Sequence, residues 1–121
     1  MIATTISQSK HLLELGLDHA TADCVWAGTG LGKDWLRSIP PKGHEDEICP
    51  AWSLSALLDV MPKENPLTAY HIEIYSTKTG WNVGWFPPND DEDVLIFYEK
   101  DLITAAYRMV VWLLENGHIK K

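Results

Sequence analysis

The side chains best suited to chemistry gather first between His44 and Cys49. Within six positions this stretch holds His44, Glu45, Asp46, Glu47 and Cys49, all of them potential metal ligands. Zinc requires three or four ligands in tetrahedral geometry, which adjacent side chains of one loop do not hold in place. The paired-cysteine spacing of structural zinc sites is also missing. We therefore favour a solvated acidic loop, with a weak metal-binding domain as an alternative.

Cys49 is also a potential nucleophile, because the thiolate form of cysteine is reactive. It would need a histidine beside it, and no spacing in the chain ties any of the five histidines to it. Its neighbours Ile48 and Pro50 favour a buried structural thiol. We therefore name no catalytic residue, no metal ligand and no cofactor, and keep a small cysteine- or histidine-dependent enzyme as an alternative.

Three further patterns resemble known sites only in part. His71 and Glu73 form the His-x-Glu pair of zinc deaminases, but the paired cysteines that should follow are absent downstream. The acidic run Asn89–Asp93 lacks the central glycine and distant glutamate of a calcium loop. The glycines of Gly28–Lys33 are not followed by the Lys-Ser or Lys-Thr pair of a phosphate-binding loop. We expect an exposed strand face, a charged turn and a hairpin loop, respectively.

Aromatic side chains form the strongest functional signal. Trp81 and Trp85 alternate along one predicted strand, with Phe86 on the opposite face and Tyr75 on the preceding strand. Half of this cluster should pack against the last helix. If Tyr75 and Phe86 lie in the open, they would form a contact surface for another protein or a second copy of the chain.

The charge balance limits the partners. Ten basic and seventeen acidic residues leave a net charge of −7. Nucleic acid and anionic membranes would repel such a chain, so we expect neither as a partner. A basic protein or self-association fits better. Met1–Gln8 has no secretory pattern and no apolar run could span a bilayer, which predicts a cytoplasmic protein with reduced cysteines.

The most strongly patterned element is a helix over Asp101–Gly117. Its apolar residues recur at helical spacing and form one broad stripe: Leu102, Ala105, Ala106, Met109, Val110, Leu113 and Leu114. Asp101 should cap its amino end through the carboxylate, and Gly117 should end it in a left-handed conformation. We expect this helix to lie across a sheet.

The remaining elements predict a single α+β domain over residues 1–121, large enough to bury about 65% of the surface of its unfolded chain. We expect helices near Ile6–Leu15 and after Pro50, the second ending at Pro62. Short strands should lie around Trp26 and Trp35, and a three-stranded meander should follow Pro66, with Gly80 at a positive-φ turn position. The prediction is one small antiparallel sheet of about four or five strands on three helices, ordered α-β-β-α-β-β-β-α.

Several blocks of the chain resemble a family of short uncharacterised proteins encoded in phages and mobile elements of gut anaerobes. These blocks are Ser9–Leu17, Thr21–Asp23, Pro50–Pro62 and Ala105–Leu114. The resemblance implies an origin and a compact α+β fold, but no catalytic residues. Together with the charge and the aromatic cluster, it predicts a non-catalytic protein–protein interaction or accessory factor of a phage or mobile element.

Overall fold

Regular structure follows the predicted order, with one added strand. The computed structural model describes residues 2–28, 34–38, 47–63, 71–87 and 94–119. Its elements, in chain order, are α1 (Ile6–Glu14), the short 3-10 helix η1 (His19–Thr21), β1 (Cys24–Gly28), β2 (Asp34–Ser38), β3 (Glu47–Ala51), α2 (Leu54–Val60), β4 (His71–Ser76), β5 (Trp81–Phe86), β6 (Leu95–Glu99) and α3 (Leu102–Glu115). The α+β class is confirmed.

The strands form two sheets rather than the single sheet that we expected. One sheet has the order β2-β1-β3 and the other the order β4-β5-β6, and all neighbouring strands are antiparallel. The described part of the chain therefore has six strands, not four or five. The second sheet is the predicted meander, with Ile74 opposite Val83 and Val83 opposite Phe97.

The additional strand is β3. The sequence predicts a loop that ends here and a helix that follows Pro50, with no strand between them. Pro50 weakens the strand signal of this segment because proline cannot donate a backbone hydrogen bond. It lies opposite Val25 on an edge strand, where proline is tolerated. A bulge opposite Trp26 and Ala27 further hides the strand, because it breaks the alternation that a sequence pattern would show.

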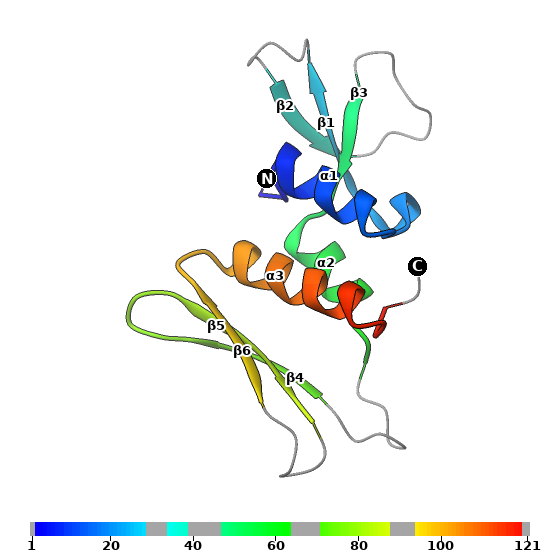
Figure 1. Cartoon of the computed structure of the whole chain (residues 1–121). Coiled ribbons are helices and arrows are strands. Elements are labelled where there is room, and N and C mark those ends of the chain that lie inside the picture. The colour runs from blue at the N-terminus through cyan, green and yellow to red at the C-terminus, as the bar shows by residue number, and fades with distance from the viewer. Residues whose placement is uncertain (1, 29–33, 39–46, 64–70, 88–93, 120–121) are drawn as a thin grey trace.

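The helices lie between the two sheets (Figure 1). Helix α1 contacts β3 of the first sheet, whereas α3 contacts β5 and β6 of the second and also packs against α2. The predicted stripe of α3 is buried from Ala105 to Leu114, with Met109, Val110 and Leu113 fully inaccessible. These side chains meet Val83 from the sheet and Leu57 from α2 in the main hydrophobic core. The prediction that α3 lies across a sheet is therefore confirmed.

Both long helices end in the same way. In α3, Gly117 adopts a φ of 75°, and the N–H of His118 donates to the carbonyl of Leu113 at 2.8 Å. In α1, Gly16 has a φ of 95°, and the N–H of Leu17 donates to the carbonyl of Leu12 at 3.0 Å. This left-handed termination satisfies carbonyls that a helix end would otherwise leave open.

Side-chain caps form at the amino ends of α1 and α2, but not at that of α3. Thr5 caps α1 in a complete capping box, and Ser53 caps α2 by accepting from the N–H of Ala56. Asp101 stands at the cap position of α3, but its carboxylate makes no capping hydrogen bond, so that expectation was wrong. Its φ is −103°, against −66° and −69° at Thr5 and Ser53, and this backbone does not aim the carboxylate at the first turn.

Gly80 was also predicted for the wrong reason. It does not adopt a positive φ, unlike Gly16, Gly28 and Gly117. Instead, a Cβ atom at this position would lie 2.5 Å from the carbonyl oxygen of Glu99. Glycine is required here because the backbones of the β4–β5 turn and of β6 approach each other closely.

A buried polar cluster ties the amino-terminal segment to the rest of the fold. Thr4, Ser9 and Trp52 are all inaccessible to solvent. The Thr4 and Ser9 hydroxyls lie 2.7 Å apart, and the N–H of Trp52 donates to Thr4 Oγ1 at 3.0 Å. The Thr4 carbonyl accepts from Trp26 Nε1 at 2.8 Å. One threonine thus links α1, β1 and the start of α2, and every polar atom named here has a partner.

Candidate interaction surface

The second sheet has one side covered by α3 and one side open to solvent. Side chains alternate between the two sides along each strand. The open side carries Tyr75 from β4, Phe86 from β5, Ile96 and Tyr98 from β6, and Val94 just before β6; we call these five residues the outer face. Four of them keep between 39% and 48% of their surface exposed, although all are large and apolar or aromatic. Such a concentration on one side of a sheet is typical of a contact surface.

The outer face is supported from below by glycine. Gly84 lies opposite Ile96 and is buried, because a ring carbon of Phe86 lies only 2.7 Å from where its Cβ would be. The Phe86 ring also stacks on His71, with the ring centroids 5.2 Å apart and the planes within 8°. Phe86 therefore packs over Gly84 and beside His71 on the outer face.

Hydrogen bonds fix the polar margins of this surface. At one end, Thr79 Oγ1 and the Tyr98 hydroxyl lie 2.6 Å apart, which orients the Tyr98 ring. At the other end, His71 Nε2 lies 3.2 Å from Glu73 Oε1, and both side chains are about half exposed. Polar side chains with a fixed orientation at the ends of the surface resemble the polar rim of a protein interface.

The four predicted interaction residues divide between the two sides of the sheet. Tyr75 and Phe86 lie on the outer face. Trp81 and Trp85 point to the helix side, where Trp85 packs 5.3 Å from Trp112 between ring centroids. The contact surface predicted from the sequence did not include Val94, Ile96 and Tyr98. Their alternation with Leu95 and Phe97 also indicates side chains on the side of the sheet opposite the helix.

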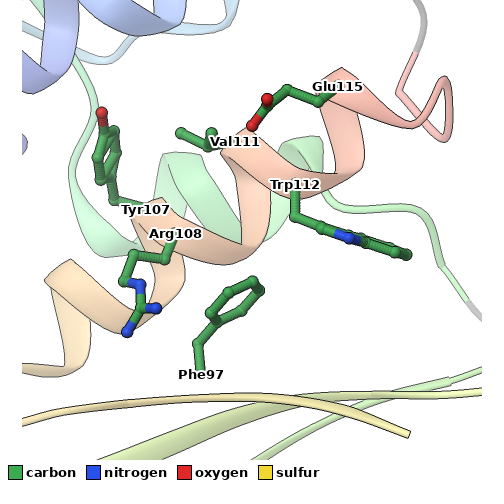
Figure 2. A pocket seen from close by; sticks show the side chains of 6 residues that line it. All are labelled: Phe97, Tyr107, Arg108, Val111, Trp112 and Glu115. Atoms are coloured by element: carbon green, nitrogen blue, oxygen red, sulfur yellow. The ribbon is translucent and has the colours of Figure 1, made fainter. Parts of the chain in front are cut away.

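A groove of about 240 Å³ runs along the exposed side of α3 (Figure 2). Arg108 and Trp112 point toward the sheet and Phe97 rises from β6, whereas Tyr107 and Glu115 point away from it. The Arg108 guanidinium lies 4.7 Å over the Phe97 ring. Its Nη1 atom donates to the Tyr98 carbonyl at 3.3 Å and lies 3.5 Å from Glu99. Arg108 is therefore engaged within the fold, and the groove offers apolar walls rather than an acid–base pair.

The two cysteines lie on neighbouring strands, and both are buried and form no disulfide. Burial, together with the adjacent Asp23 carboxylate, raises the pKa of Cys24 to about 11. Burial also raises the pKa of Cys49. A nucleophilic cysteine requires the opposite shift, toward the thiolate. The geometry of these thiols fits the structural role predicted for Cys49.

The remaining sequence candidates fall in two groups. His71 and Glu73 lie on an exposed strand, as predicted, and the described residues contain no cluster of three or more His, Cys, Asp or Glu side chains able to hold a metal. His44–Asp46, Asn89–Asp93 and Gly30–Lys33 lie outside the described residues.

Comparisons with protein-family profiles, with curated proteins and with solved structures find no match to this chain. Among the described residues, no helix has the length and apolar character to cross a membrane.

Proposed function

We propose that this chain is a non-catalytic protein–protein interaction factor that binds a basic protein through the outer face. The observation that carries the proposal is the exposure of Tyr75, Val94, Ile96 and Tyr98 on the same uncovered side of one sheet. Leaving this much apolar surface in water is unfavourable, and a partner that covers it would recover that free energy.

The chemistry of the partner follows from charge. A chain with a net charge of −7 attracts basic surfaces and accelerates its encounter with them. Apolar contacts at the centre would then supply most of the affinity, with aromatic residues such as Tyr98 as anchors. Nucleic acid does not fit this charge. The resemblance noted above favours an accessory role in a phage or mobile element, acting in the cytoplasm of the host.

Affinity purification with matched variants tests the proposal. Ile96→Lys introduces a charge that repels a basic partner at the centre of the outer face, whereas Trp35→Lys makes a similar change on the other sheet. The two side chains are 45% and 49% exposed, so both variants should fold. A specific partner should bind the wild type and Trp35→Lys equally, and bind Ile96→Lys at least about tenfold more weakly.

Salt provides the second readout. Binding to a basic partner should weaken as ionic strength rises, because salt screens the attraction between opposite charges. Partners that bind Ile96→Lys as well as wild type, or that bind equally well at high salt, would contradict the proposal.

A further inference from the structure

The free edge of β4 is a second feature that a partner could use. Strand β4 lies at the edge of its sheet, and among the described residues only β5 pairs with it. The N–H of Thr77 donates to the carbonyl of Gly80 at 2.8 Å, so this pair faces inward. Antiparallel strands alternate between inward- and outward-facing residues. The backbone groups of Ile72, Ile74 and Ser76 therefore point away from the sheet.

The opposite edge of the same sheet is protected. On β6, the outward-facing carbonyl of Tyr98 accepts a hydrogen bond from Arg108, which is itself held beside Glu99. A long cationic side chain across an edge is a common device against strand pairing. Strand β4 has no equivalent: it contains no lysine, arginine or proline, and no described side chain donates to its outward carbonyls.

Ile74 marks the place where an added strand would lie. It points to the helix side of the sheet, yet it remains 37% exposed and lies outside the main core, whereas its neighbour Ile72 packs against that core. Beside Ile74 is a groove of about 290 Å³ whose other walls include Leu58 and Met61. A strand added to β4 would satisfy the open backbone groups and cover Ile74 at the same time.

We propose that this strand is β4 of a second copy of the chain, paired antiparallel about a two-fold axis that places Ile74 opposite its own equivalent. Such an interface is self-complementary. Ile72 then lies opposite Ser76 of the second copy, and Glu73 opposite Tyr75. A shift of two residues would place Glu73 opposite Glu73, and like charges directly opposite each other are unfavourable. Charge therefore disfavours the register with Glu73 at the axis, and we place Ile74 there because it is the exposed apolar residue of β4 whose backbone groups point outward.

The dimer would join two three-stranded sheets into one sheet of six strands. The two outer faces would then become continuous, which doubles the surface that the proposed function assigns to a basic partner. The dimer depends only on the edge of β4, and binding of a basic protein depends only on the outer face, so either can fail while the other stands.

Sedimentation equilibrium of the full chain over a wide concentration range tests the dimer. Ile74→Lys should weaken self-association at least about tenfold, because it places two ammonium groups opposite each other at the axis. Tyr75→Lys is the matched control: it changes the next residue, which is 39% exposed and points to the outer face. The control should dimerise at least as strongly as the wild type, because the introduced ammonium group lies opposite Glu73 of the second copy. Circular dichroism of both variants establishes that they fold.

The dependence on salt separates the two proposals. Two copies that each carry a charge of −7 repel each other, so self-association should strengthen as ionic strength rises. Binding of a basic partner should weaken under the same change.

Disulfide formation tests the register. Residues opposite each other in a hydrogen-bonded antiparallel pair have Cα atoms about 5.5 Å apart, within the range that a disulfide spans. Ile74→Cys should therefore give a covalent dimer in oxidised glutathione, and Tyr75→Cys should not, because its two copies lie diagonally. A chain that is monomeric at every concentration and salt, a dimer unaffected by Ile74→Lys, or equal cross-linking of the two cysteine variants would overturn the proposal.

Discussion

Removing the Thr4 hydroxyl should destabilise the fold strongly, although the side chain is small and lies near the amino end of the chain. Thr4→Val keeps the shape of the residue and both of its backbone hydrogen bonds. It removes only the oxygen that accepts from the N–H of Trp52 and that lies 2.7 Å from the Ser9 hydroxyl. All three residues are fully buried, so water cannot replace the lost partner.

The magnitude follows from what is left without a partner. Thr4→Val leaves the Trp52 N–H and the Ser9 hydroxyl buried and unsatisfied, at about 1–3 kcal/mol each, so we expect a loss of about 2–6 kcal/mol. Ser9→Ala alone removes one hydrogen bond while Thr4 still accepts from Trp52, which should cost about 1 kcal/mol. A domain of this size has a total stability of about 5–15 kcal/mol, so the two single variants should be easy to tell apart.

The double variant gives the sharpest result. In the Thr4→Val background, Ser9→Ala removes a hydroxyl that has already lost its partner, so it should restore about 1–3 kcal/mol. The same substitution is thus destabilising in the wild type and stabilising in the variant. Urea unfolding, monitored by tryptophan fluorescence and by circular dichroism, gives the free energy of unfolding of the wild type, both single variants and the double variant. These four values complete a double-mutant cycle.

An additive result would refute this reasoning. If Ser9→Ala changes the free energy of unfolding by the same amount in both backgrounds, the two hydroxyls do not interact. If Thr4→Val is as stable as the wild type, the Trp52 N–H finds another partner and Thr4 does not link the elements in the way described.

Three further predictions concern the core, a turn and a pH-dependent contact. Leu113→Asp should abolish cooperative unfolding, because an unpaired charge in this fully buried position costs several kcal/mol; near-ultraviolet circular dichroism measures the loss. Gly80→Ala should lower the melting temperature, because its Cβ would lie 2.5 Å from the backbone oxygen of Glu99. Burial alone would raise the pKa of Asp23, but hydrogen bonds from the Ser53 hydroxyl and N–H lower it. Its contribution to stability is complete above the unfolded-state pKa of about 3.9 and should be lost as the pH falls through the lower folded-state pKa, which urea midpoints at successive pH values measure.

Each of these predictions has a control within the chain. Asn116→Asp adds the same charge at an exposed position and should unfold cooperatively. Gly117→Ala meets no atom within 4 Å and should lose only the cost of its positive φ, about 1–2 kcal/mol. Asp23→Asn should flatten the acid limb of the stability curve. A cooperative Leu113→Asp variant, a Gly80→Ala variant as stable as the wild type, or an unchanged acid limb would each contradict the corresponding argument.

The elements that the sequence predicted well are those set by local chemistry. Helix α3 has an unbroken apolar stripe, and the hairpin of β4 and β5 has strict alternation, so both patterns are visible without tertiary information. Strand β3 was missed because Pro50 and a bulge erase its local signature, and only its neighbour β1 makes it a strand. The division into two sheets depends on which strands pair, a long-range property that periodicity does not carry.

The candidate surface was predicted in part for similar reasons. Alternation placed Phe86 and Tyr75 on the side opposite to Trp81 and Trp85, and the structure has this arrangement. That β6 extends the same surface could be read from its own alternation only once its pairing with β5 was known. The covering of the β6 edge by Arg108 depends on side-chain packing between α3 and the sheet, which no local pattern encodes.

The position of α3 at the end of the described chain has a consequence during synthesis. When the nascent chain has left the ribosome as far as β6, all six strands have been made, but Val83 and the helix side of the second sheet still lack their cover. Until α3 follows, the nascent chain would expose apolar side chains on both sides of the second sheet. A chaperone that binds nascent polypeptides would then be expected to recognise it.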